Sequence, residues 1–507
     1  MNQPDILLFI SDQHTPYYSG YFGGNVDTPT MDAMAKNGTN AAACYTPCPL
    51  CVPSRMAMLS TLMPHKTGIY TNGDTLPDTT PTFLHPLVAA GYETVLIGRM
   101  HFIGADQRHG FTKRIAPDMT ETTWFSDQAE AIQQRGRLFA TFSDFAATKV
   151  VGAGESPVIH YDRMVVDQAL EYLSQEHEKP QCIVVGTYGP HFPYIGETKL
   201  FQKYYDRVAL PATLQEIPEY MNELLLCRRR PVTEEVARGC LAAYCAQIEL
   251  QDQLLGEVRD AFRNFTERRQ SRSFFAYLSD HGDQAGDRMI YGKNTFFERS
   301  VRVPLLVEGD GIGKGNTITQ SVSLLDIGPT LWELTGAAGL EETDGISLMP
   351  GLTGKEMPSD RIVFSELLER RSPRPGEPYH YARMALQNGK KYITYQNFEE
   401  KDMLFCIDKD PEEQNNIIAE DSAADVLRRA CGTLGDPEQI LARQKHRDRN
   451  KKLFAAWEKA AGAQASETWK DNPPTAKGQL EIEITPPWDG SFPGRVTGGA
   501  GAERKLL

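Results

Sequence analysis

Short apolar runs alternate with amphipathic segments along the first two-thirds of the chain, and this alternation restricts the fold more than any other feature. The apolar runs are residues 6–10, 94–97, 182–186, 274–278 and 303–307, and each ends near Gly, Ser, Asp or His. Amphipathic segments such as 30–36, 161–175 and 241–262 lie between them. Buried strands that alternate with helices predict an α/β fold, in which helices sandwich a large, mixed, mainly parallel sheet.

Polar side chains lie just beyond the expected ends of these strands. They are Asp12, His101, His191, Asp280 and His281. In a parallel sheet, ligands gather outside the carboxyl ends of the strands. A single aspartate there more often caps a helix or forms a turn, but two aspartates and a histidine together can hold a divalent cation. The shared position predicts a functional site at this edge of the sheet.

The character of the chain changes near residue 361. Segments 381–386, 391–395 and 403–407 resemble short antiparallel strands, with a turn at 387–389, and a helical region follows from 423 to 461. Residues 471–507 are rich in Pro and Gly, which is typical of an extended arm. We therefore expect a catalytic domain at 1–360, a smaller C-terminal α+β subdomain at 361–470, and an arm at 471–507.

Charge and composition exclude several classes of partner. The net charge of −14 argues against binding of nucleic acid, which is a polyanion. No run approaches the ~20 apolar residues of a membrane span, so we expect no membrane partner. The first residues contain no basic region followed by an apolar stretch and a cleavage site. Nine cysteines without a regular framework are typical of reduced thiols, and the expected compartment is the cytoplasm.

The stretch CYTPCPLCVPSR allows two interpretations. Its cysteines, Cys44, Cys48 and Cys51, have a C-x3-C-x2-C spacing with which three thiolates can hold an iron–sulfur cluster. The last five residues, Cys51 to Arg55, instead have the form of a site where one cysteine becomes a catalytic nucleophile. An iron–sulfur cluster would leave the strand-end aspartates and histidines without a shared purpose.

Four motifs follow one another along the chain. They are Cys51-Val-Pro-Ser-Arg55 with Thr67-Gly68-Ile69-Tyr70, then GRMHFIGADQRHGF, SDHGD followed by Tyr-Gly-Lys293, and LFCIDKDPEEQNN. These motifs resemble those of sulfatases in the alkaline phosphatase superfamily, including choline-sulfatase-like and arylsulfatase members. They extend from Asp12 to about Asn416 in the order usual in that family. The resemblance implies an alkaline-phosphatase-like fold and hydrolysis of a small sulfate monoester to an alcohol and inorganic sulfate.

The resemblance also implies the active-site chemistry. A maturation enzyme would oxidise Cys51 to formylglycine, whose hydrate supplies the attacking hydroxyl and a second hydroxyl that expels sulfate. Cys44 and Cys48 would then be packing residues. A divalent cation, Ca²⁺ in preference to Mg²⁺ or Mn²⁺, would be bound by oxygen and imidazole ligands. The implied residues are Asp12, Gln13, Cys51, Asp280 and His281 for the metal, Arg55, Arg99, His101, His191 and Lys293 for catalysis, and Asn72 for a sulfate contact.

Four questions stay open at the level of sequence. Gln13 and His281 replace the Asp and Asn of many sulfatases, a pattern shared with phosphonate monoester hydrolases and choline-sulfatase-like enzymes, and a phosphonate or phosphate ester hydrolase is the alternative. A catalytically silent binding protein is a second alternative. The alcohol half of the substrate could be choline, an aryl group, a steroid or a sugar, and a homo-oligomer is compatible with the sequence.

Overall fold

A large mixed sheet forms the centre of the computed structural model, which describes residues 3–104, 106–116, 118 and 147–461. The arm expected at 471–507 lies outside these residues. In spatial order the strands are β12 (Asn316–Ile318), β2 (Thr39–Ala41), β11 (Leu305–Gly309), β9 (Ser273–Ser279), β1 (Asp5–Asp12), β7 (Gln181–Pro190), β4 (Glu93–Gly98) and β5 (Lys113–Arg114). Strands β9, β1, β7, β4 and β5 are parallel, whereas β11 is antiparallel to both of its neighbours. The predicted sheet is confirmed.

Strand β1 is apolar on both faces because the sheet is covered on both sides. Ile6, Leu8 and Ile10 belong to one hydrophobic core, whereas Leu7 and Phe9 belong to another. Successive side chains of a strand point to opposite faces, so this division places one core on each face of the sheet. A continuous apolar run is typical of a parallel strand buried in this way.

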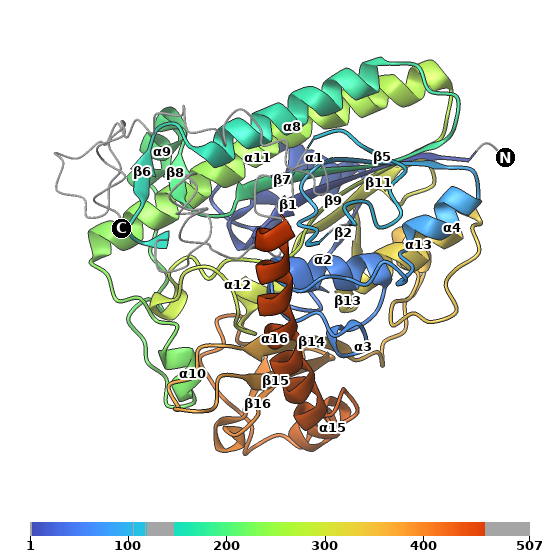
Figure 1. Ribbon diagram of the computed structural model, residues 1–507. Helices are drawn as coiled ribbons and strands as arrows, with labels where there is room; N and C mark the ends of the chain where they lie inside the picture. The colour runs from blue at the N-terminus through green and yellow to red at the C-terminus, as the bar shows by residue number, and fades with distance from the viewer. Residues whose placement is uncertain (1–2, 105, 117, 119–146, 462–507) are drawn as a thin grey trace.

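Helices cover the two faces (Figure 1). One face carries α1 (Pro29–Asn37), α8 (Pro157–Ser174) and α11 (Glu234–Arg269), and the other carries α2 (Cys51–Ser60), α4 (Leu84–Ala89) and α13 (Ile327–Thr335). The hydroxyls of Ser156 and Thr233 accept hydrogen bonds from the first turns of α8 and α11, which satisfies donors that no helix can pair internally. Helix α11 extends beyond the predicted 241–262 at both ends.

The C-terminal subdomain contains an antiparallel sheet and two helices. Its strands are β14 (Val363–Glu369), β15 (His380–Gln387), β16 (Lys390–Tyr395) and β17 (Met403–Cys406), followed by α15 (Ala423–Cys431) and α16 (Pro437–Ala461). Asn388 and Gly389, both with positive φ, form the predicted turn between β15 and β16. The sequence analysis missed β14. Helix α16 passes α2 in Figure 1, and its Arg447 lies against Gly68, which follows α3 (Pro64–Thr67).

The remaining elements are short. They are β3 (Cys44–Tyr45), β6 (Val151–Ala153), β8 (Tyr194–Gly196), β10 (Arg302–Val303) and β13 (Val322–Ser323), with α9 (Thr198–Tyr205), α10 (Glu223–Leu226), α12 (Glu298–Val301) and α14 (Met349–Leu352). Among the residues that the structure describes, none of the helices has the length and apolar composition needed to span a bilayer.

Candidate active site

The polar residues at the strand ends converge, as the sequence analysis predicted. Asp12 is the last residue of β1, and Asp280 directly follows the parallel neighbour β9, because Ser11 and Ser279 are in register. Cys51 is the first residue of α2, and its side chain lies beside them. A helix N-terminus favours negative charge, so α2 contributes to a site suited to an anion.

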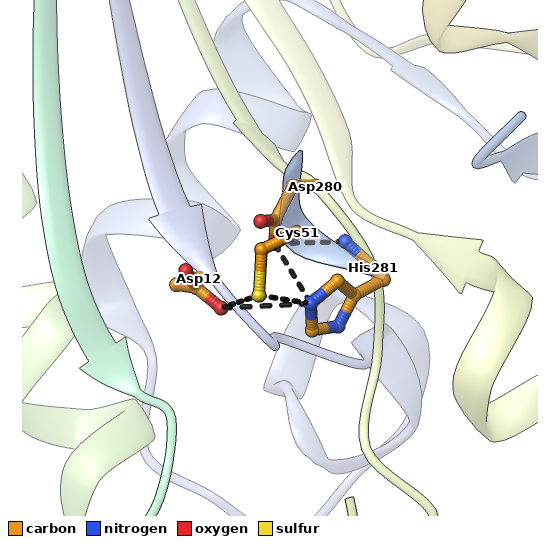
Figure 2. A group of neighbouring side chains, drawn as sticks. All are labelled: Asp12, Cys51, Asp280 and His281. Carbon is orange, nitrogen blue, oxygen red and sulfur yellow. Dashed lines mark hydrogen bonds and ion pairs between the residues drawn. The ribbon is translucent and has the colours of Figure 1, made fainter. Parts of the chain in front are cut away.

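Four side chains form a compact group with the chemistry of a metal site (Figure 2). One ligand atom from each of Asp12, Cys51, Asp280 and His281 lies within 4.8 Å of all the others. The Cys51 Sγ lies 3.2 Å from His281 Nε2 and 3.7 Å from Asp12 Oδ1. His281 Nε2 lies 3.6 Å from Asp12 Oδ1 and 3.7 Å from Asp280 Oδ1.

The tautomer of His281 indicates that this group fits a cation. Its Nδ1 lies 3.0 Å from the carbonyl oxygen of Gly282, to which it must donate, so in the neutral ring Nε2 carries a lone pair. Burial lowers the pKa of His281, which keeps the ring neutral. That lone pair faces carboxylate oxygens of Asp12 and Asp280. Three electron-rich groups facing one another are stable only with a cation between them, and a backbone carbonyl behind the imidazole is the usual support of a metal-binding histidine.

Two buried arginines compensate the carboxylates on the opposite side. Arg55 donates to Asp280 at 2.8 Å and to Asp12 at 3.2 Å, and Arg99 donates to Asp12 at 2.6 Å. Burial alone would raise the pKa of Asp12, but the cations around it, Arg99 foremost, hold it well below its usual range. Asp12 is therefore ionised and available as a charged ligand.

Arg99 also orients His101. Its Nη2 lies 2.7 Å from His101 Nδ1, so this nitrogen accepts and the neutral ring carries its proton on Nε2. Asp118 holds both partners, accepting from Arg99 at 2.9 Å and from the backbone N–H of His101 at 2.8 Å. Burial and Arg99 lower the pKa of His101, and the nearby side chain of Cys51 opposes this shift.

Lys293 and His191 lie together beside Cys51. Lys293 Nζ donates to His191 Nε2 at 2.6 Å, to Gln13 Oε1 at 2.8 Å and to Cys51 Sγ at 3.2 Å. His191 Nδ1 lies 2.7 Å from the carbonyl oxygen of Phe192, so its Nε2 is the acceptor. Burial and the charge of Lys293 hold the pKa of His191 well below its usual range.

Comparison with known proteins assigns this arrangement to a family. Residues 4–337 match the sulfatase family model, and residues 286–436 match the model described as N-sulphoglucosamine sulphohydrolase, C-terminal. The choline-sulfatase of Rhizobium meliloti (strain 1021) is 32% identical over 441 residues, which cover 82% of each chain. The chain belongs to the sulfatase family. It is a sulfuric ester hydrolase.

Other relatives agree with this assignment. Arylsulfatase K of Xenopus laevis is 26% identical over 87% of this sulfatase and 83% of its own chain. Two solved structures share the fold: a 2-O GAG sulfatase with a TM-score of 0.61, 22% identity and full coverage of both chains, and the phosphonate monoester hydrolase of Agrobacterium radiobacter with a TM-score of 0.69, 20% identity, and coverage of 87% of this chain and 96% of that one. The expected alkaline-phosphatase-like fold is confirmed.

The other predicted residues of the sulfatase lie around this centre. Gln13 has a positive φ of 70°, and its backbone N–H donates to Asp280 at 3.1 Å. Asn72 Oδ1 accepts from the backbone N–H of Val52 at 3.1 Å and so caps the first turn of α2 beside Cys51. All the catalytic and metal-ligand candidates are buried, His101 being the most exposed at 7%, whereas Asn72 is half-buried.

The cysteine stretch contributes one thiol, that of Cys51, to the candidate site. Cys44 packs in the core beneath the sheet and Cys48 in the core shared with the C-terminal subdomain. Among the described residues, the metal-site candidate contains Cys51 and neither of these two thiols. This geometry does not support an iron–sulfur cluster in the sulfatase.

Three buried aspartates that the sequence analysis did not assign to the site support its side chains. Asp118 holds Arg99 and His101. Asp283 accepts from Gln13 Nε2 at 2.6 Å, which turns Gln13 Oε1 toward Lys293, and from the Tyr194 hydroxyl at 2.8 Å. Asp162 of α8 accepts from the backbone N–H groups of residues 188 and 189, just before His191. Only Asp283 had a sequence signal, because it completes the Ser-Asp-His-Gly-Asp motif.

Proposed function

We propose that this sulfatase hydrolyses a sulfate monoester with an oxygen nucleophile derived from Cys51, after a maturation enzyme has oxidised that residue to formylglycine. The hydrate of formylglycine supplies two hydroxyls on one carbon, one to attack sulfur and one whose proton loss releases sulfate. The position of the Cys51 Sγ carries this proposal, because it lies 3.2 Å from both His281 Nε2 and Lys293 Nζ at the N-terminus of α2. A thiol with only a packing role has no need of these partners.

We propose Asp12, Gln13, Asp280 and His281 as the protein ligands of a divalent cation, with the Cys51-derived oxygen as a further ligand. Carboxylate and amide oxygens favour Ca²⁺, while the imidazole is compatible with Mg²⁺ or Mn²⁺. The bound cation would offset negative charge on the nucleophile and on the sulfate oxygens. Arg55 would keep both carboxylates in place and contact the Cys51-derived hydroxyl.

The side chains facing Cys51 divide into two groups with different tasks. His101, with its proton on Nε2 and its position fixed by Arg99, would donate a hydrogen bond to the Cys51-derived oxygen and assist release of sulfate. Lys293 is the charged donor of the second group, with His191 Nε2 as its acceptor. These two would contact the sulfate and supply the proton that the leaving alcohol needs. Asn72, beside the first turn of α2, would contact a sulfate oxygen.

We propose that this enzyme is located in the cytoplasm, which is a reducing compartment. All nine cysteines are free thiols, and eight of them have no place in the proposed chemistry. The maturation enzyme that acts on Cys51 would be the partner found there.

Mass spectrometry of the intact chain tests the proposal directly. Conversion of the Cys51 CH₂–SH group to an aldehyde should lower the mass by about 18 Da, and the change should map to the peptide that contains Cys51. Cys51→Ala should abolish turnover of aryl sulfates, whereas the matched control Cys48→Ala should cost only about 1–2 kcal/mol of stability. An unmodified Cys51 in an active preparation would refute the proposed nucleophile. Faster turnover of an aryl phosphonate than of the aryl sulfate would favour the phosphonate ester hydrolase instead.

A further inference from the structure

Two arginines of α16 converge on the segment that links α3 to Asn72. A β-carbon placed on Gly68 would lie 3.0 Å from Arg447 Nη2, 3.2 Å from Arg447 Nη1 and 3.2 Å from Arg443 Nη1. The two guanidinium groups therefore lie side by side over the same glycine. Residues 443, 447 and 451 are spaced four apart, so they lie along one face of the helix.

The two arginines lack the partners that such side chains usually have. In the part of the chain that the structure describes, neither Arg443 nor Arg447 forms an ion pair, and Arg447 Nη1 is buried without a hydrogen-bond partner. The hydrogen bond from Arg447 Nη2 to the carbonyl of Thr67 is long, at 3.5 Å. Lys451, one turn further along, shows the contrast, because it pairs with Asp74 at 2.7 Å.

Two adjacent guanidinium groups repel each other, and an anion bound to both of them relieves this repulsion. Burial and the neighbouring Arg443 lower the pKa of Arg447, which shows that this environment is unfavourable for its charge. Guanidinium groups present paired N–H donors that match carboxylate, sulfate and phosphate oxygens. Because Gly68, whose φ is +71°, has no side chain, the two guanidinium groups can lie directly against its backbone, and Arg443 is also exposed to solvent.

This arginine pair lies close to the reaction centre. Gly68 is four residues before Asn72, which caps α2 beside Cys51. Four residues span at most about 14 Å, so one ligand of two or more sugar rings could reach both places. A small alcohol such as choline could not.

We propose that Arg443 and Arg447 form a subsite over Gly68 for a second oxyanion, a sulfate or carboxylate carried by the alcohol half of the substrate. The inference rests on the proposed function, since it assigns the substrate class of the same site: an extended, polyanionic sulfate ester. Free inorganic sulfate has the same oxyanion chemistry and is the other source of a ligand for this subsite.

Selectivity between two matched substrates tests the proposal. We would compare a monosulfated with a disulfated disaccharide of the same sugars, using the mature enzyme and the Arg443→Gln and Arg447→Gln variants. The ratio of kcat/KM values should favour the disulfated substrate, and each variant should lower this ratio about tenfold, through KM, as expected for loss of a hydrogen bond to a charged group. Arg449→Gln, which removes an exposed charge on the same helix, should keep the wild-type ratio. Arg447→Lys should restore only part of it, because lysine lacks the paired donors.

Calorimetric titration with sodium sulfate distinguishes a site for the substrate from a site for the free anion. It also distinguishes failure of the subsite from failure of the proposed function. Wild-type protein should bind sulfate at two places, the reaction centre and the arginine pair, and Arg447→Gln at one. A loss of sulfate binding without a change in selectivity would overturn the substrate assignment and leave a site for the free anion. An unchanged selectivity ratio together with unchanged sulfate binding would overturn the subsite altogether. If the enzyme hydrolysed no sulfate ester, the proposed function would be wrong. Loss of one sulfate-binding site in Arg447→Gln would still support the anion subsite in that case.

Discussion

Two pairs of arginines in this molecule differ in what surrounds them. Arg55 and Arg99 lie at the strand ends and pair with carboxylates, whereas Arg443 and Arg447 lie over Gly68 and form no ion pair in the described part of the chain. Paired arginines are held in place without a ligand, because the protein itself supplies their acceptors. Unpaired arginines keep donors free for something that the protein does not supply. The comparison separates two arginines whose acceptors belong to the protein from two arginines whose donors are left for a ligand.

The largest effect should come from removing a carboxylate that pairs with Arg55. Asp280→Ala removes a proposed metal ligand and leaves Arg55 without its 2.8 Å partner. We expect the metal content to fall together with the activity, which should drop at least about 100-fold. The free energy of unfolding should fall by about 3–5 kcal/mol, because a buried charge loses its counterion. Elemental analysis and thermal unfolding would measure the two effects.

Asp326→Ala is the matched control for this change. Asp326 is equally buried and pairs with Arg361 at 2.6 Å, away from the reaction centre. Its loss should cost similar stability but leave the metal content normal. Normal metal occupancy in Asp280→Ala would remove Asp280 from the metal site.

The second prediction concerns Lys293 and His191 beside Cys51. Lys293→Met and His191→Ala should lose about 10²–10³-fold on an alkyl sulfate but less than tenfold on 4-nitrophenyl sulfate, because nitrophenolate leaves without a proton. Lys293→Met should be the more severe of the two, since Lys293 is the charged donor and His191 Nε2 the acceptor. Equal losses on both substrates would mean that these two side chains bind sulfate without donating a proton.

A smaller effect should follow from weakening the hydrogen bond that holds the Gln13 side chain to Asp283. Asp283→Asn would place an amide where a carboxylate accepts from Gln13 Nε2, so Gln13 Oε1 would no longer be held toward the site. We expect the dissociation constant of the divalent cation to rise about 10–100-fold, as is usual for outer-shell changes. The same substitution in a Gln13→Ala background should add little. Tyr194→Phe removes the other side-chain donor to Asp283 and serves as the control. Additive effects of Gln13→Ala and Asp283→Asn on metal affinity would contradict this role.

The strand ends could be predicted from the sequence, whereas the supporting residues could not. Apolar runs locate buried strands, and parallel pairing then brings Asp12 and Asp280 together whatever the loops do. The carboxylates of Asp118 and Asp162 come from segments whose spacing has no simple relation to the site. The edge-like strand β14 was missed because the acid Glu366 interrupts its apolar pattern. The convergence of Arg443 and Arg447 on Gly68 depends on how the C-terminal subdomain packs against the rest of the chain. Local sequence does not encode that packing.

The smallest predicted effect lies beside the unpaired arginines, where α3 contacts the C-terminal subdomain. His65 Nδ1 lies 2.6 Å from Glu366 Oε1, and although burial opposes the charge, this hydrogen bond raises the pKa of His65. A histidine whose pKa is raised by folding stabilises the protein fully below its unfolded pKa of about 6.5, and this stabilisation is lost as the pH rises through the folded pKa. Because His65 is partly exposed, solvent screening keeps the contribution under about 1 kcal/mol. His65→Gln should therefore lower the unfolding temperature at pH 6 more than at pH 9, whereas His446→Gln, an exposed control on α16, should not. A His65→Gln difference that is constant across this pH range would mean that the contact acts through packing and not through charge.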